Sequence, residues 1–265
     1  MRYGPSASEL PVGSAWPQSV GAATHLVFHD EFSGNALDTK IWYRCFNWAN
    51  ENAGCKTQPG ELELYQVPNV VVSGGKLRLI ARHQRASWKG KTYRFTSGMI
   101  QSGGSPSNGA TPTFSFLYGY AEVRAKLPAG SIGMWPAFWL LPADNSWPPE
   151  VDIMEWQGVT PQEDQATLWW SLPNGDAARV YETGVDLSSA YHTYALDWEP
   201  GYVDFYFDRR RIMHYTGSNV PHRAMFVLVN LAIGGWEKGQ LNPPPSEFPT
   251  TYSVDYVRVW NRKPF

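Results

Sequence analysis

Short runs of β-branched and aromatic residues, separated by Gly, Pro, Asn and Asp, recur along the whole chain and constrain its fold more than any other feature. No segment keeps a helical periodicity for more than a turn or two, and no repeat or linker interrupts the pattern. Such spacing is typical of many short antiparallel strands. We expect one domain over residues 1–265, with residues 1–22 as an extended N-terminal segment. The expected strands are His25–Phe28, Asn69–Val72, Lys76–Ala81, Tyr120–Leu127, Trp135–Leu141, Tyr191–Trp198, Tyr202–Asp208, Met225–Ile233 and Ser253–Trp260.

Two of these runs show the alternation of a strand with two unlike faces. From Ala121 to Leu127, small apolar residues alternate with charged ones, and the run from Val203 to Asp208 follows the same rule. Successive side chains of a strand point to opposite faces, so each run has one apolar face. The chain is therefore predicted to be all-β, with two antiparallel sheets packed as a sandwich.

Charge and hydropathy exclude several classes of function. The formal net charge is −2, so there is no excess of basic residues to neutralise the phosphates of a nucleic acid. No apolar run is long enough to span a bilayer, and we expect a soluble protein without a membrane partner. The first residues, Met1 to Pro5, lead into a polar stretch rather than a signal peptide, so we expect a mature chain, which leaves secretion open.

The two cysteines, Cys45 and Cys55, enclose a polar loop. They are either two buried thiols or a disulfide that closes this loop. We favour the disulfide, which implies an oxidising compartment. No further cysteine or nearby pair of histidines supports a zinc site.

Aromatic residues are unusually abundant. The chain has 13 Trp, 14 Tyr and 12 Phe, whereas only 17% of its residues are charged. A sandwich core uses some of these rings, and the surplus of tryptophan suits the flat apolar faces of sugars. Tryptophan also serves cores and protein interfaces, so this observation alone does not identify a sugar site.

The segment Glu150–Glu155 carries the candidate chemistry, because it places three acids on one expected strand. Regular alternation puts Glu150 and Asp152 on one face and would turn Glu155 to the opposite, apolar face. One extra residue, a β-bulge at Ile153-Met154, would return Glu155 to the face of the other two acids. We predict this bulge.

The spacing of the three acids then suits a glycosidase. Four strand steps cover roughly 13 Å, and two glutamate arms leaning together could close this to about 5–5.5 Å, the separation that retaining enzymes use. Three crowded carboxylates also repel each other, so at least one should keep its proton at neutral pH. The alternative is an acidic strand face in solvent. The flanking tryptophans, and the absence of any basic residue between Ala129 and Arg179, argue against it.

The same segment resembles the E-x-D-x-x-E signature of glycoside hydrolase family 16, and further motifs of this family follow in order over most of the chain. They are His29–Phe32, Leu37-Asp38, Tyr118–Arg124, Gly133–Trp139, His192–Tyr194, Asn230–Ala232 and Asp255–Val259. The resemblance implies a β-jelly-roll sandwich, similar to concanavalin A, with a concave cleft for a polysaccharide. The inserted Met154 resembles the bulged strand of the laminarinase-like branch.

The resemblance also implies roles for individual residues. Glu150 would be the nucleophile and Glu155 the general acid/base, and Asp152 would hydrogen-bond the nucleophile. For each tryptophan in the cleft, packing in the core remains the alternative to sugar contact. The implied substrate contacts are Trp135, Trp139, Trp147, Trp169, Asn230 and Trp236.

Two segments depart from the family pattern. Trp169-Trp170 stands where related endo-1,3-glucanases often have His-Tyr or His-Trp, so a polar contact near the cut is missing from the expected place. Gln58-Pro59-Gly60 replaces the usual Asn-rich approach to Glu61-Leu62-Glu63. Both departures bear on the choice of glucan more than on the type of reaction.

Many members of this family hold a structural calcium ion on the convex face. By position its ligands here would be the carbonyls of Glu31 and Gly75 and the carboxylate of Asp255. The alternative is that Asp255 caps or pairs near the start of a strand. Catalysis itself needs no cofactor.

We therefore expect a secreted, monomeric, retaining endo-hydrolase of β-1,3-glucan. A second hypothesis keeps the mechanism but changes the polymer to a mixed-linkage β-glucan, a galactan or another exopolysaccharide. A third, of another class, is a non-catalytic lectin-like sandwich. It accounts for the fold and the tryptophans, but it gives no reason for three acids on one strand.

Overall fold

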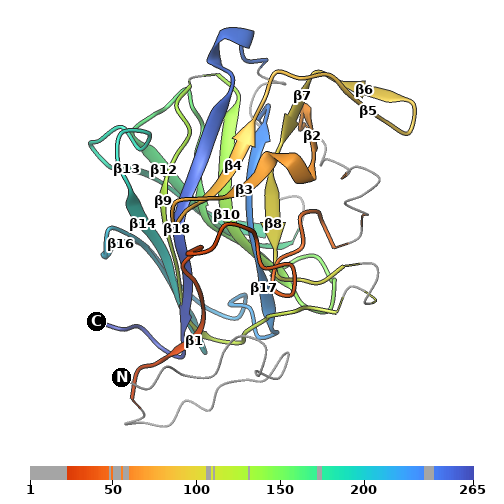
Figure 1. Cartoon of the computed structure of the whole chain (residues 1–265). Helices are drawn as coiled ribbons and strands as arrows, with labels where there is room; N and C mark the ends of the chain where they lie inside the picture. Colours follow the sequence, from red (N-terminus) through yellow and green to blue (C-terminus); the bar gives the residue numbers. More distant parts are fainter. Residues whose placement is uncertain are drawn as a thin grey trace.

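The computed structural model describes residues 23–47, 49, 55, 60–105, 109, 111–130, 132–171, 175–235 and 242–265, and in this part the chain folds into two large sheets packed face to face (Figure 1). The expected N-terminal segment, residues 1–22, lies outside the described residues. No helix among the described residues has the length and apolar character needed to cross a bilayer. The all-β sandwich is confirmed.

The larger sheet has eight strands. Its order is β16 (Arg210–Thr216), β15 (Tyr202–Phe207), β14 (His192–Glu199), β9 (Gly119–Lys126), β18 (Thr250–Trp260), β4 (Leu77–Ala81) and β3 (Val70–Val72), with β1 (Leu26–Asp30) paired to β18. All of these pairings are antiparallel.

The smaller sheet has six strands, again all antiparallel. Its order is β13 (Gly175–Glu182), β12 (Glu163–Ser171), β11 (Glu150–Glu155), β10 (Met134–Pro142), β17 (Met225–Ile233) and β8 (Met99–Gln101). It carries the expected acidic strand, β11, near its middle.

Short elements complete the described fold. β2 (Glu63–Tyr65) pairs with β7 (Phe95–Ser97) in parallel, an exception to the expected antiparallel pairing. β5 (Ala86–Trp88) and β6 (Lys91–Tyr93) form a hairpin that projects beside the sandwich (Figure 1). Two 3-10 turns cover Val67–Asn69 and Pro245–Glu247. Asn69, expected to begin a strand, ends the first of these turns instead, where its side chain donates hydrogen bonds to the Ile80 carbonyl (2.6 Å) and Thr96 Oγ1 (3.1 Å).

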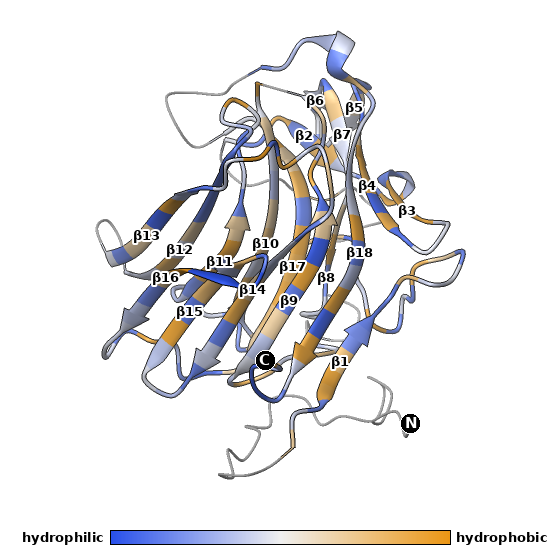
Figure 2. Ribbon diagram, turned by 90° about the vertical axis from the view of Figure 1, so that its left-hand side faces the viewer, coloured by the Kyte–Doolittle hydropathy of each residue, from blue (hydrophilic) through white to orange (hydrophobic). Residues whose placement is uncertain are grey.

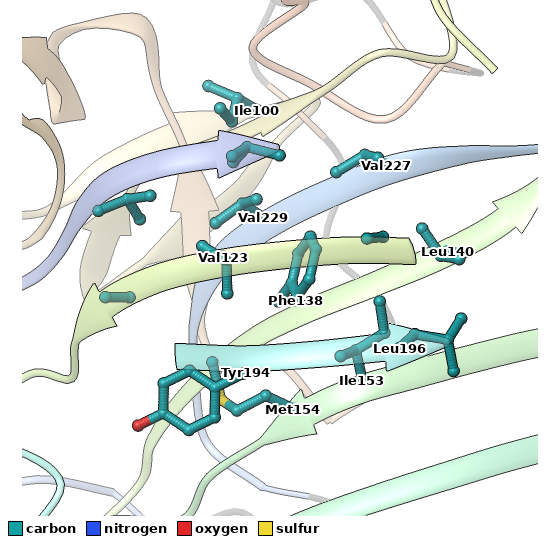
Figure 3. Packing of buried hydrophobic residues seen from close by; sticks show 14 of the residues in the cluster. Ile100, Val123, Phe138, Leu140, Ile153, Met154, Tyr194, Leu196, Val227 and Val229 are labelled. Atoms are coloured by element: carbon teal, nitrogen blue, oxygen red, sulfur yellow. The ribbon is translucent and has the colours of Figure 1, made fainter. Parts of the chain in front are cut away.

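The core lies between the two sheets and confirms the predicted alternation. Ala121, Val123 and Ala125 on β9 are fully buried in it, and Figure 2 shows hydrophobic and hydrophilic residues alternating along β9 and β18. Figure 3 shows Val123 and Leu196 of the eight-stranded sheet packed with residues of the six-stranded sheet. Burial of such apolar side chains is the main favourable contribution to folding.

The disulfide between Cys45 and Cys55 is confirmed, with 5.4 Å between the α-carbons. Both cysteines belong to a second apolar cluster, which includes Tyr65 and Trp139. This cluster lies on the outer face of the six-stranded sheet, since Trp139 also lines the cavity described below. The disulfide thus lies in the apolar cluster beside the wall of the candidate site.

A buried acid lies between the two sheets. Asp164 of β12 is fully buried, and both its carboxylate oxygens lack a hydrogen-bond partner among the described residues, as do the buried hydroxyls of Tyr194 and Tyr252. Burial, and then the nearby negative charge of Glu155, hold the pKa of Asp164 well above its ordinary value. Asp164 therefore holds its proton more tightly in the folded protein than in the unfolded chain.

Replacing Asp164 by Asn should change how stability depends on pH. Because the folded-state pKa of Asp164 is raised, the wild type loses stability as the pH rises above the unfolded value of about 3.9. Asn has no such titration, so the melting temperature of Asp164→Asn should rise relative to the wild type between about pH 4 and pH 7. Circular-dichroism melts across this range test the prediction, and a difference that stays constant with pH contradicts it.

Candidate active site

The acidic strand β11 contains the predicted bulge, and the bulge determines where its side chains point. Asp152 pairs with Trp139 of β10 and Thr167 of β12, whereas Glu155 pairs with Ala137 and Gln165. From Asp152 to Glu155, β11 thus takes three residue steps, whereas β10 and β12 each take two over the same length. As a result Ile153 and Met154 are both fully buried in the core, where Figure 3 shows them.

All three acids of β11 therefore face one cavity of about 440 Å³ on the outer side of the six-stranded sheet. Of the predicted substrate contacts, Trp135, Trp139, Trp147 and Asn230 also line it. Trp169 is not among the described lining residues, and Trp236 lies outside the described part of the chain. A cavity of this size lies in the range of small-molecule and cofactor sites.

Each of the three acids accepts a hydrogen bond from a different tryptophan. The indole Nε1–H of Trp147 donates to Glu150 Oε2 at 2.6 Å. The Nε1–H of Trp169 donates to Asp152 Oδ2 at 2.9 Å, and that of Trp135 donates to Glu155 Oε1 at 3.1 Å. Sequence reasoning gave these rings a role in sugar contact or packing and missed their second role as polar donors to the carboxylates.

Trp169 also resolves the first departure from the family pattern. It stands where a histidine was expected, and its indole N–H supplies a polar contact in this place, directed at Asp152. The neighbouring Trp170 turns the other way and stacks on Tyr215, with 5.3 Å between ring centroids. The polar group at this position therefore contacts an acid of the site, although Trp169 is not among the described residues that line the cavity.

The pKa of Glu155 is raised to about 8 by burial and by the nearby negative charge of Glu150, while the hydrogen bond from Trp135 acts in the opposite direction. Burial also raises the pKa of Glu150, but here hydrogen bonds from Trp147 and Asp152 both favour the ionised form. At neutral pH the site can thus combine a protonated Glu155 with an ionised Glu150.

Asp152 lies between these two glutamates and is 3% exposed. Burial raises its pKa well above the ordinary value, and repulsion from Glu155 and Glu150 adds to the effect. A hydrogen bond links Asp152 to Glu150 and opposes the effect of burial on the pKa of Glu150. This contact favours the ionised form of Glu150.

A chain of hydrogen bonds leads across the cavity wall away from the three acids. Trp139 Nε1 donates to Asn230 Oδ1 at 2.7 Å, and Asn230 Nδ2 donates to the Tyr65 hydroxyl at 3.0 Å. This hydroxyl donates in turn to Glu61 Oε1 at 3.0 Å. Sequence reasoning identified Asn230 and noted Glu61, but it missed Tyr65, because a lone tyrosine in a short strand carries no pattern that separates it from core.

The residues predicted to bind calcium do not fit that ion. Lys76 Nζ lies 2.6 Å from Asp255 Oδ1 and 3.2 Å from the Gly75 carbonyl, and Arg124 pairs with the other oxygen of Asp255. A lysine ammonium group therefore already contacts two of the three predicted ligands. The Glu31 carboxylate makes a two-pronged ion pair with Arg258 (2.8 Å for each contact). Asp255, which lies in β18, instead forms ion pairs with Lys76 and Arg124, as the alternative to a calcium site had it.

Removing the Lys76 ammonium should destabilise the protein in a pH-dependent way. Burial raises the pKa of Asp255, but hydrogen bonds from Lys76 and Arg124 outweigh this effect and hold it below the ordinary value. A carboxyl with a lowered folded-state pKa contributes stability above the unfolded pKa and loses it at lower pH. The melting temperature of Lys76→Met should therefore fall below that of the wild type at pH 7, and the difference should shrink in acid.

Lys126→Met is the matched control, since Lys126 lies on the same sheet and forms no ion pair among the described residues. Its effect on the melting temperature should be small. Addition of calcium or of a chelator should leave the wild-type melting temperature unchanged. A clear rise with calcium would contradict the assignment of this site to Lys76.

Comparison with known proteins relates this site to an enzyme family. A model of the glycosyl hydrolases family 16 matches residues 66–258. Endo-1,3-1,4-beta-glycanase EglC of Rhizobium meliloti is 31% identical over 250 residues, which cover 88% of this chain and 51% of the relative. Glucan endo-1,3-beta-glucosidase A1 of Niallia circulans is 31% identical over 284 residues, which cover 96% of this chain and 40% of the relative. The chain thus spans about half or less of the length of these curated relatives.

A solved structure extends the comparison to the fold. The catalytic domain of an endo-1,3-beta-glucanase (laminarinase) from Thermotoga petrophila aligns with a TM-score of 0.77 and 29% sequence identity, over 91% of this chain and 99% of that one. The sandwich is therefore the jelly roll that the resemblance implied. Because the family model covers most of the sequence, and the bulged acidic strand lies on the wall of the cavity, the chain belongs to the glycosyl hydrolases family 16.

Proposed function

We propose that the chain is a retaining endo-β-1,3-glucanase in which Glu150 is the nucleophile and Glu155 the general acid/base. The observation that carries this proposal is the pair of unlike glutamates on one cavity wall. Glu155 has a pKa of about 8, whereas Glu150 accepts two hydrogen bonds that favour its charged form. A retaining glycosidase needs one protonated and one ionised carboxyl on the two sides of the scissile bond.

In the first step, a carboxylate oxygen of Glu150 attacks the anomeric carbon, and the bond from this carbon to the leaving glycosidic oxygen breaks. Glu155 transfers its proton to that oxygen, so the leaving chain departs as an alcohol. In the second step, ionised Glu155 takes a proton from water, whose oxygen attacks the anomeric carbon and releases Glu150. Two inversions leave the configuration unchanged.

Asp152 would act on the nucleophile rather than on the sugar. Its hydrogen bond to Glu150 lowers the pKa of that glutamate and keeps it ionised in spite of burial. The indole N–H of Trp169 in turn donates a hydrogen bond to the Asp152 carboxyl and fixes its orientation. Preorganised hydrogen bonds of this kind need no rearrangement during the reaction.

Aromatic rings near the acids support a sugar as the ligand. Trp147 is 49% exposed at the cavity edge, a degree of exposure that core packing does not account for. Trp135 also lines the cavity, beside Glu155. Such rings can stack on pyranose faces while their N–H groups hold the carboxylates. Trp139 lines the same cavity, so all three rings support the predicted contacts with the substrate.

A mixed-linkage β-glucan is the second candidate, because the relative EglC is named an endo-1,3-1,4-beta-glycanase. Two observations favour β-1,3-glucan. The inserted Met154 resembles the laminarinase-like branch, and the Thermotoga petrophila structure is that of a laminarinase. The disulfide further supports secretion, because disulfides persist in oxidising compartments and polysaccharide substrates lie outside the cell.

Removing the proposed acid/base should make the enzyme dependent on an external nucleophile. Glu155→Ala should lower kcat on laminarin by about 10²–10⁴-fold. Azide, which needs no deprotonation by Glu155, should restore turnover and give a β-glycosyl azide. Glu150→Ala should lower kcat by on the order of 10³-fold or more and should not give this product.

The wild-type reaction, followed by nuclear magnetic resonance, should release reducing ends of β configuration first. An α product would exclude double displacement. Binding of laminarin and of mixed-linkage glucan without release of reducing sugar would instead support the lectin-like hypothesis.

Trp135→Phe should shift the pH profile. The hydrogen bond from Trp135 lowers the pKa of Glu155, so its loss should raise that pKa above about 8. Because the general acid must be protonated, the alkaline limb of kcat/KM should move to higher pH, whereas the acidic limb, which reports Glu150, should stay in place. Trp139→Phe is the control, because its indole donates to Asn230 rather than to a β11 acid. Equal shifts in both variants would contradict this role.

A further inference from the structure

A second cavity, of about 370 Å³, lies next to the one that holds the three acids. Glu61 lines both this cavity and the first one, so the two share a wall. Most of the other residues around the second cavity come from one short segment, Lys91–Phe95, which includes strand β6 and the start of β7. In Figure 1 this segment forms the second strand of the projecting β5–β6 hairpin and continues into β7.

The hairpin segment Arg82–Arg94 carries an unusual charge. It contains five of the chain's 22 Lys and Arg residues and no Asp or Glu, although the whole chain has a net charge of −2. Among the residues that the structure describes, none of these five cations forms an ion pair. A run of unpaired like charges repels itself, so a bound anion would relieve this repulsion.

Two of the five cations, Lys91 and Arg94, line the second cavity. Lys91 Nζ lies 4.6 Å from the ring centroid of Tyr93, which is 5% exposed and lines the same cavity. The Arg94 guanidinium lies 5.6 Å from the ring centroid of buried Phe95. These fixed rings hold the two cations at the cavity by cation–π attraction and leave their N–H donors free.

Glu61 is the one acid among the described residues that line this cavity. Its Oε1 accepts the hydrogen bond from Tyr65, on the side of the first cavity. Among the described residues that line it, the second cavity thus has two cations against a single acid. A lysine and an arginine beside a hydroxyl from Thr92 form a suitable donor set for a carboxylate or a sulfate group.

We propose that the second cavity is a distal subsite for an anionic sugar residue, so that the enzyme accepts β-glucans that carry carboxylate or sulfate substituents. The proposal rests on the proposed function, since it treats the second cavity as a continuation of a polysaccharide cleft. A neutral glucan would pass through the same subsite without using Lys91 and Arg94. The cations thus determine which substituted chains are favoured.

The double variant Lys91→Gln/Arg94→Gln tests this subsite against Arg85→Gln/Lys89→Gln. Both variants remove two charges from the same segment, but Arg85 and Lys89 are not among the described residues that line the second cavity. Initial rates would be measured on laminarin, on lightly carboxymethylated laminarin and on lightly sulfated laminarin. The two modified substrates distinguish a preference for carboxylate from one for sulfate.

Lys91→Gln/Arg94→Gln should lower kcat/KM about three- to tenfold on at least one modified laminarin and leave it unchanged on laminarin itself. The control variant should behave like the wild type on all three substrates. The wild-type preference for the modified polymer should also fall as sodium chloride is raised, because salt screens exposed charges. Equal losses on neutral and modified laminarin, or equal losses in the two variants, would overturn the subsite.

Binding to Glu150→Gln separates this proposal from the hydrolytic one. Calorimetry with carboxymethylated and sulfated laminarin oligosaccharides measures affinity without turnover. The affinity of Glu150→Gln would be compared with that of the triple variant Glu150→Gln/Lys91→Gln/Arg94→Gln. Weaker binding by the triple variant would support the subsite, even if the wild type cleaves no laminarin. Unchanged affinity would exclude the subsite, while leaving the hydrolysis of neutral laminarin untouched.

Discussion

The bulge in β11 is the constraint on which the rest of the site depends. Without it, Glu155 would point into the apolar core, where burial penalises its charged form, and Met154 would point into the cavity. With it, the core gains two adjacent apolar side chains, Ile153 and Met154, and the cavity gains a third acid. One extra residue thus satisfies the core and the site together, which explains why the strand tolerates the loss of regular pairing.

Three indole N–H groups then differentiate the acids that the bulge brings together. Burial alone would raise the pKa of all three carboxyls and would give no assignment of roles. The hydrogen bonds are unequal, because Glu150 accepts from both Trp147 and Asp152, whereas Glu155 accepts from Trp135. This inequality leaves the proton on Glu155. Trp135 and Trp147 also line the cavity, so their ring faces can meet the proposed sugar ligand.

Two regions of this chain replace expected features by other chemistry. At the predicted calcium site, the Lys76 ammonium contacts the Asp255 carboxylate and the Gly75 carbonyl. At the position expected for histidine, the indole of Trp169 supplies the polar donor. At the first place a positive charge still contacts the oxygens, but it belongs to a lysine. At the second place the position still carries an N–H donor, but it belongs to an indole. Motif matching alone therefore predicts the place of a contact better than its partner.

The sequence by itself determined the fold class, most central strands and the three acids. Strand β17 has the predicted bounds, because it is buried throughout and apolar at every position but Asn230. The edge strands β13 and β16 were missed, since they are largely exposed and have no comparable apolar pattern. Period-2 reasoning also predicted the bulge, because the phase of Glu155 required it.

Only the tertiary structure decided which groups act on these acids. Trp147 lies three positions from the glutamate that it contacts, but Trp135 and Trp169 lie 20 and 17 positions from theirs. Nothing local to these two rings shows which carboxyl each will contact. The same holds for Tyr65 and Asn230, which lie 165 positions apart, and for Lys76 and Asp255, which lie 179 apart. Strand periodicity is a local property that the sequence displays, whereas pairing across sheets and loops depends on how the whole chain packs.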